Sequence, residues 1–153
     1  MKVDAVSQFW SACKYPEFLT VSGTDMIQRL HTDKAPAAIG PYSQSVKHGD
    51  HLFVSGQLPL SNDGSMVEES FAAQVRTSLE NLTVIVREAG FGATGRPFEI
   101  VKVTAYLADI SKYPEFNDVY SEFFGENQPA RAVVGVASLP KNAPVEIECI
   151  AMS

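Results

Sequence analysis

Apolar residues recur every three or four positions in the middle of the chain, which is the spacing of one face of an α-helix. The stripe comprises Phe71, Val75, Leu79, Leu82 and Val86. It predicts a helix over residues 68–89. Gly90 follows this stretch and favours the helix ending there, because glycine readily takes the left-handed backbone conformation of a helix terminus.

Alternating apolar and polar positions predict strands in most of the remaining chain. They cover residues 26–31, two strands within 43–58 that meet at a turn at Gly49 and Asp50, and residues 98–109, 131–138 and 144–152. A second helix is predicted from Ser111, as its N-cap, to about Phe124, with Pro114 near its first turn. The order β-β-β-α-β-α-β-β predicts an α+β domain in which one mixed sheet has two helices packed on one face.

The last strand has apolar residues on both of its sides. Val145, Ile147, Cys149 and Ala151 share one side, and Glu146, Glu148, Ile150 and Met152 share the other. Two helices cover only one face of the sheet, so we expect a second subunit to cover the other. The sequence therefore predicts an oligomer.

Composition and charge narrow the class of protein. The chain has 153 residues, of which 45% are hydrophobic and 20% are charged, which is enough for one domain with a core. Its net charge of −6 and the absence of a run of basic residues argue against nucleic acid as a partner. Its apolar runs are too short for a membrane span.

The cysteines and histidines indicate neither a disulfide framework nor a metal site. Cys13 and Cys149 are the two cysteines, which favours a reducing compartment, and we expect Cys149 to be a core residue. The histidines lack the spacing of zinc ligands, so no metal is predicted. A cytoplasmic location is expected, with a mitochondrial one as the alternative.

Residues 1–25 are expected to form an N-terminal extension that precedes a single domain over residues 26–153. The extension lacks the charged start and continuous apolar stretch of a secretory signal, and its acidic residues weaken a mitochondrial presequence. The pentapeptide KYPEF occurs in it at 14–18 and again at 112–116. Five residues are too few for a structural repeat.

Three charged residues stand in the two apolar segments that end the chain, namely Arg131, Glu146 and Glu148. A charge in a buried strand is costly unless it is paired or hydrogen-bonded. Arg131 and one of the glutamates could form an interface ion pair that stabilises an oligomer. The alternative is that they bind and act on a ligand, and the residues alone leave both readings open.

Several stretches resemble the RidA/YjgF/UK114 family of reactive-intermediate deaminases, whose members are also named endoribonuclease L-PSP. These are APAAIGPYSQ, LFVSGQLPL, YSEFF and PARAVVGVASLPKNAPVEIECIA, and the resemblance covers about residues 26–152. It implies a chorismate-mutase-like subunit, a homotrimer with ligand clefts between subunits, and no cofactor. It further implies hydrolysis of 2-imino acids, which pyridoxal-phosphate-dependent dehydratases release, to 2-keto acids and ammonia.

The resemblance also implies roles for single residues. Arg131 falls on the family's substrate arginine and Glu146 on its glutamate, and Tyr42 falls on the tyrosine of the cleft. The remaining ligand-binding positions fall on Ser55, Gly56, Asn117 and Val133. Val133 stands where many members carry a cysteine, so thiol chemistry is excluded at this position. The family's imine hydrolysis needs no such thiol.

The expected chemistry assigns a different task to each charged residue. The guanidinium of Arg131 would bind the substrate carboxylate through two parallel hydrogen bonds, and Glu146 would take a proton from the attacking water. Both residues open their strands. If these strands run antiparallel, the two residues lie at opposite ends of the sheet, so we expect sites that two subunits share.

Two other functions stay open from the sequence. Some members of the family are described as endoribonucleases that inhibit translation, and the acidic balance of this chain argues against that activity. A non-catalytic module that binds a keto acid or a similar carboxylate is the third possibility.

Overall fold

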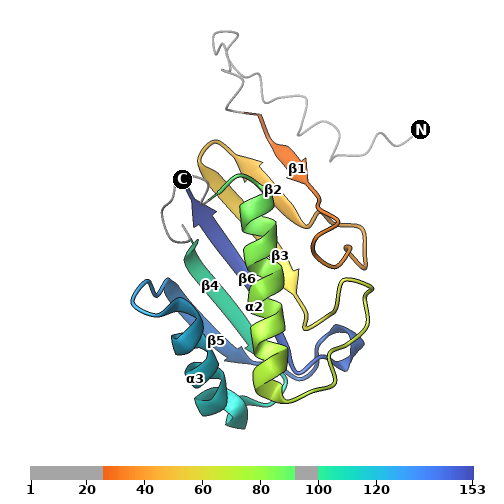
Figure 1. Cartoon of the computed structure of the whole chain (residues 1–153), viewed down its shortest axis with the longest axis vertical. Helices are drawn as coiled ribbons and strands as arrows, with labels where there is room; N and C mark the ends of the chain where they lie inside the picture. The colour runs from red at the N-terminus through yellow and green to blue at the C-terminus, as the bar shows by residue number, and fades with distance from the viewer. Residues whose placement is uncertain (1–25, 92–99) are drawn as a thin grey trace, which may run out of the picture.

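The computed structural model describes residues 26–91 and 100–153, which form one sheet and two helices (Figure 1). The strands are β1 (Gln28–Leu30), β2 (Ser45–His48), β3 (His51–Gln57), β4 (Ile100–Leu107), β5 (Ala130–Gly135) and β6 (Val145–Met152). The helices are α2 (Phe71–Glu88) and α3 (Tyr113–Phe124), with 3₁₀ turns η1 (Ile110–Lys112) and η2 (Pro140–Asn142). The predicted α+β class and order of elements are confirmed.

The order of the strands in the sheet is β1-β2-β3-β6-β4-β5. All neighbours are antiparallel except β4 and β5, which are parallel and are connected through α3. The last strand of the sequence, β6, therefore lies in the middle of the sheet, and β4 separates it from β5. β5 and β6 run antiparallel to each other but do not touch.

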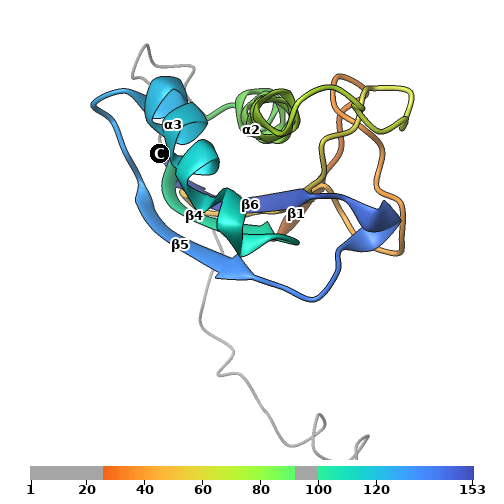
Figure 2. The same cartoon turned by 90° about the horizontal axis from the view of Figure 1, so that it is seen from below.

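Both helices lie on the same face of the sheet, as Figure 2 shows. The apolar stripe of α2 faces the core, where Val75, Leu79 and Leu82 are fully buried. The sheet contributes the predicted side of β6, including Cys149, whose pKa is raised by burial. Cys149 is thus the core residue that the sequence predicts.

The other face of the sheet carries large apolar side chains that no described residue covers. Phe53, Val134 and Met152 are 48%, 43% and 37% exposed. Their neighbours along the strands point into the core, so these three side chains point away from the helices. The predicted apolar second face is confirmed, while the subunit that would cover it stays a prediction.

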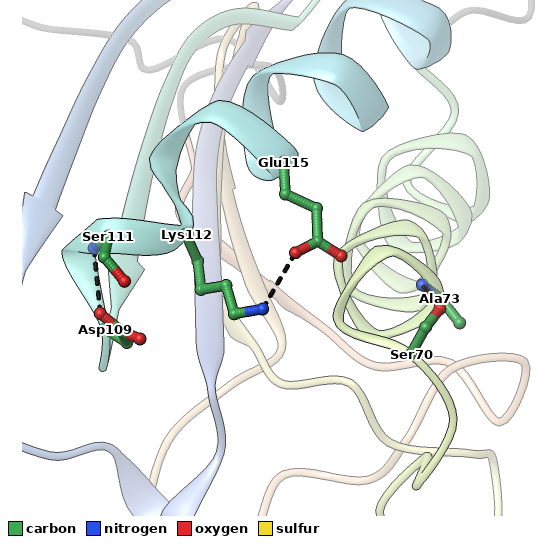
Figure 3. A network of polar contacts seen from close by, with 6 residues as sticks. All are labelled: Ser70, Ala73, Asp109, Ser111, Lys112 and Glu115. Carbon is green, nitrogen blue, oxygen red and sulfur yellow. Dashed lines mark hydrogen bonds and ion pairs between the residues drawn. The ribbon is translucent and has the colours of Figure 1, made fainter.

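The ends of the helices depend on local hydrogen bonds. α2 begins three residues later than predicted, because the Ser70 hydroxyl accepts a hydrogen bond from the Ala73 N–H at 3.2 Å and caps the helix. Gly90 follows α2 with a φ of 84°, as expected of a helix end. The prediction of Ser111 as the second N-cap is wrong: its own N–H donates to Asp109 at 2.9 Å, at the start of η1 (Figure 3). α3 itself begins at Tyr113.

Three strands are shorter than predicted. The strand expected over 131–138 ends at Gly135, and the one expected over 26–31 covers only residues 28–30. For the strand expected over 98–109, the first two residues lie outside the described part of the chain. The predicted extension, residues 1–25, lies outside it as well, with the first copy of KYPEF.

Candidate functional site

The residues that the resemblance assigns to the site separate into two groups on opposite faces of the sheet. Arg131 pairs in register with Val103, whose side chain is buried beneath the helices. Glu146 pairs with Tyr106 and points to the face without helices. The two residues are about 10 Å apart along the strands and about 10 Å apart across them, from the spacing of residues and strands in a sheet. The two strands run antiparallel as expected, but the residues are only three positions apart along β4, so opposite faces of the sheet, rather than the predicted opposite ends, separate them.

Arg131 lies against α3, and two polar groups of that helix fix its guanidinium. Nη2 donates a hydrogen bond to Asn117 Oδ1 at 2.7 Å and a longer one to the Tyr113 hydroxyl at 3.3 Å. Both acceptors are uncharged. The guanidinium is thereby oriented without being neutralised. We call Arg131, Asn117 and the aromatic residues of α3 around them the arginine half-site.

Three aromatic rings of α3 surround the same guanidinium. The Tyr120 ring is nearest, with its centroid 4.4 Å from the Arg131 Cζ, and those of Phe116 and Tyr113 are 5.5 and 5.8 Å away. The electron-rich face of an aromatic ring attracts a cation at these distances. Asn117 and the rings occupy positions i, i+3, i+4 and i+7 of the helix, so they share one face.

The positive charge of Arg131 has no counter-charge in the described chain. No carboxylate of residues 26–91 or 100–153 lies within 4.0 Å of it. An ion pair with Glu146 or Glu148 of the same chain is therefore not formed. Beside the guanidinium lies a hollow of about 410 Å³, lined by Asn117, Tyr120, Ser121, Gln128, Pro129 and Arg131. An anion could enter this hollow and reach the uncompensated charge.

The second group, the glutamate half-site, consists of Tyr42, Ser55, Gly56 and Glu146. These four residues line a hollow of about 340 Å³ together with Ile39, Leu58, Pro140 and Glu148. β3 and β6 approach each other here with an irregular register between Val54 and Gln57. A bulge of this kind re-aims side chains at the edge of a site.

The side chain of Glu146 lies directly over Gly56. A Cβ atom on Gly56 would stand 2.7 Å from the Glu146 Cδ and closer still to Oε1. A side chain at position 56 would therefore have to displace the Glu146 carboxylate, which occupies this space. Gly56 in this way determines where Glu146 can point.

Ser55 and Tyr42 make their own contacts within the chain. The Ser55 hydroxyl donates to the Ser43 carbonyl at 2.7 Å, so its proton is engaged. The Tyr42 hydroxyl accepts from the Ile39 N–H at 3.2 Å and donates to no group in the described residues. Tyr42 is 44% exposed, so this phenol can donate a hydrogen bond to a ligand.

The surroundings of Glu146 raise the pKa of its carboxyl group. Burial raises the pKa of Glu146, and repulsion by Glu148 on the same face raises it further. Glu148 is itself held by the Tyr106 hydroxyl, which donates to its Oε1 at 3.1 Å. A raised carboxyl pKa is typical of groups that act as general bases near neutral pH.

Some of the contacts could not be foreseen from the resemblance. The rings of Tyr113, Phe116 and Tyr120 are absent from the predicted site, although their helical spacing relative to Asn117 was visible in the sequence. Val133 lies two residues beyond Arg131 on the same face of β5. Its side chain is partly buried and packs against the main core. The described residues contain no cluster of three or more His, Cys, Asp or Glu that could bind a metal.

Comparison with known proteins identifies the family. Residues 32–153 match the family described as Endoribonuclease L-PSP. The chain belongs to this family. One L-PSP family relative, a RutC family protein of Pyrococcus abyssi, is 43% identical over 123 residues, or 80% of this chain and 94% of the archaeal one.

Two further proteins to which the chain is similar carry more informative names. Reactive Intermediate Deaminase A, chloroplastic, of Arabidopsis thaliana is 39% identical over 150 residues, or 95% of this chain and 78% of the plant protein. The crystal structure of E. coli TdcF with bound serine has a TM-score of 0.75 and 38% identity, covering 82% of this chain and 98% of TdcF. The fold implied by the sequence resemblance is thereby confirmed.

The contact of Gly56 with Glu146 in this L-PSP family protein predicts a coupled effect on stability. We expect Gly56→Ala to lower the free energy of unfolding by about 1–3 kcal/mol, because the added methyl group clashes with the carboxylate. Glu146→Ala removes the clashing group, so the double variant should regain most of the loss. Urea denaturation of both single variants and the double variant measures this, and strictly additive effects would contradict the contact.

Proposed function

We propose that this protein is a deaminase that hydrolyses reactive 2-imino acids to 2-keto acids and ammonia. The observation that carries the proposal is Arg131, which is held by neutral groups beside a hollow and has no carboxylate partner in the described residues. The name of the Arabidopsis relative supports a deaminase. The serine bound to TdcF has a carboxylate and a nitrogen on one carbon, as a 2-imino acid has.

The substrate carboxylate binds to Arg131 in this proposal. Its planar guanidinium can donate two parallel hydrogen bonds to one carboxylate, which fixes the ligand in orientation as well as in position. One nitrogen, Nη2, is already used by Asn117 and Tyr113, and the other N–H groups donate to no group in the described chain. The aromatic rings limit the access of water, which strengthens the attraction.

Glu146 acts on the attacking water. The carboxylate takes a proton from water as the oxygen adds to the imine carbon, so that a carbinolamine forms. Glu146 returns this proton to the nitrogen and then takes the proton of the carbinolamine hydroxyl, which also passes to the nitrogen. The C–N bond then breaks, and ammonia leaves as the C=O bond of the keto acid forms. Tyr42 donates a hydrogen bond at the mouth of the site, and the backbone of Gly56 permits close approach of the ligand. No step requires a cofactor.

One subunit cannot apply both groups to one small ligand, because Arg131 and Glu146 point to opposite faces of its sheet. We therefore place the site between subunits of a homotrimer, where Arg131 of one subunit faces Glu146 of another. The exposed apolar face around Phe53, Val134 and Met152 supports such an assembly, because a surface of this kind is commonly buried by a partner.

Endoribonuclease activity is the second candidate, and the description of the matching family favours it. The net charge of −6 weighs against it, because RNA binding depends largely on clustered positive charge. A non-catalytic carboxylate-binding module would use the same arginine half-site. Neither alternative predicts that the protein accelerates imine hydrolysis, so a measurement of that rate distinguishes both from a deaminase.

Neither helix in the described part of the chain has both the length and the apolar character of a membrane span. A cytoplasmic location and a domain boundary at residue 25 stay predictions. The chloroplast location in the name of the Arabidopsis relative applies to that protein alone.

A coupled assay tests the activity. A pyridoxal-phosphate-dependent dehydratase releases the imine from serine or threonine, and we expect this protein to accelerate keto-acid formation. Arg131→Ala should lower kcat/KM by about 100-fold or more, because the carboxylate loses a charged hydrogen-bonding partner. Arg131→Lys should be intermediate because lysine cannot bind both oxygens in parallel. Arg76→Ala, which alters an exposed arginine of α2, is the control. Equal rates with and without the protein would refute the deaminase.

Mixed trimers test whether the site is shared. Arg131→Ala and Glu146→Ala subunits should each be inactive alone. After they are unfolded and refolded together in equal amounts, about one interface in four combines an intact Arg131 with an intact Glu146, so activity should return to about a quarter of the wild-type value. Native mass spectrometry verifies that the trimers are mixed. An absence of recovery in proven mixed trimers would contradict the shared site.

The pH dependence of the rate tests the role of Glu146. Only the ionised carboxylate can accept a proton, and its pKa lies above the ordinary glutamate value. We therefore expect kcat/KM to fall on acidification through a pH above the ordinary glutamate pKa. Glu148→Gln removes the repulsion and should shift this fall to lower pH, since the ionised form of Glu146 then becomes easier to maintain. If kcat/KM of Glu148→Gln fell at the same pH as that of the unaltered protein, the proposed repulsion between Glu146 and Glu148 would be contradicted.

A further inference from the structure

The hydroxyl of Tyr113 lies next to the guanidinium of Arg131, and its O–H group is available as a hydrogen-bond donor. Nη2 of Arg131 donates to the Tyr113 oxygen at 3.3 Å, so this oxygen is the acceptor in the contact. The hydroxyl donates to no group in residues 26–91 or 100–153, and Tyr113 is 39% exposed. A phenol in this state is free to donate toward an anion on the arginine.

We propose that Tyr113 is a second carboxylate-binding residue, whose hydroxyl donates a hydrogen bond to the carboxylate that Arg131 holds. The inference rests on the proposed function, because it assigns a further contact within the same site. The carboxylate then binds to an arginine–tyrosine pair rather than to a single side chain. Ligands with a free carboxylate beside the reacting carbon are favoured over neutral analogues.

The two tyrosines at the guanidinium have different roles. The Tyr120 ring is the closest aromatic group, at 4.4 Å, and its hydroxyl is buried without a partner, with a pKa raised by burial to about 12. It therefore acts through its ring. The Tyr113 ring is farther away, at 5.8 Å, while its oxygen is in hydrogen-bonding contact. A phenylalanine would suffice at position 113 if only packing were needed there.

The start of α3 holds Tyr113 in place. Asp109 accepts the Ser111 N–H at 2.9 Å, and Lys112 Nζ lies 3.2 Å from Glu115 Oε2 across the first turn, as Figure 3 shows. Tyr113 is the first residue of the helix, with Pro114 directly after it. Proline fixes the backbone of a first turn in a helical conformation. The phenol is thus attached to a well-defined backbone position.

The test is the variant Tyr113→Phe, which keeps the ring and removes the hydroxyl. We expect KM for the imine to rise roughly 10-fold with kcat nearly unchanged, because a hydrogen bond to a charged group that is equally strong in ground and transition states contributes to binding alone. The affinity for the product 2-oxobutanoate, measured by calorimetry, should fall by the same factor. The affinity for 2-oxobutanamide, in which an amide replaces the carboxylate, should change much less.

Glu122→Gln is the matched control, because it removes an exposed ion pair of the same helix, with Arg76 of α2, and contacts neither Arg131 nor Tyr113. It should bind 2-oxobutanoate as the unaltered protein does. If Tyr113→Phe also binds it unchanged while Arg131→Ala loses binding, the Tyr113 inference is overturned and the proposed function stands.

Binding of 2-oxobutanoate that weakens in Tyr113→Phe, in a protein that does not accelerate imine hydrolysis, would support the inference and overturn the deaminase. An unaltered protein that binds no 2-oxobutanoate would overturn both. A 10-fold loss that is equal for the keto acid and its amide would also overturn the inference, since the hydroxyl would then not act on the carboxylate.

Discussion

A guanidinium that is partly removed from bulk water needs neighbours that compensate for lost hydration. Arg131 finds them on one face of α3, where three rings and the Asn117 amide oxygen surround it. None of these groups carries a negative charge. The positive charge is therefore fixed in direction but not neutralised within the described chain. The carboxylate chemistry proposed for this protein depends on that arrangement.

The strand order explains why this charge cannot act alone with Glu146 of the same subunit. β4 lies between β5 and β6, and the register turns Arg131 toward the helices and Glu146 toward the open face. Each half-site has its own hollow. The same open face bears exposed apolar side chains, so the surface that favours assembly also carries Glu146, the proposed general base. In the proposed deaminase, assembly and catalysis are therefore linked through β6.

The sequence predicts local features of the fold better than it predicts the long-range ones. The stripe of α2 is regular over four turns, so its existence was clear, although its start depended on the Ser70 cap. Asp109 and Ser111 are both good capping residues, and the pattern alone could not tell which one accepts the hydrogen bond. The central position of β6 depends on pairing between distant segments, which alternation along one strand does not reveal. The contact of the aromatic residues with Arg131 depends on how α3 lies against β5, which the pattern of either segment alone does not determine.

Crystals of the protein with bound 2-oxobutanoate provide the most direct measurement of the role of Arg131. We predict that the ligand carboxylate lies within hydrogen-bonding distance of the Arg131 guanidinium of one subunit, with Glu146 of a neighbouring subunit close to the C2 carbon. A ligand whose carboxylate is held elsewhere, with the Arg131 guanidinium turned to bulk solvent, would contradict the account.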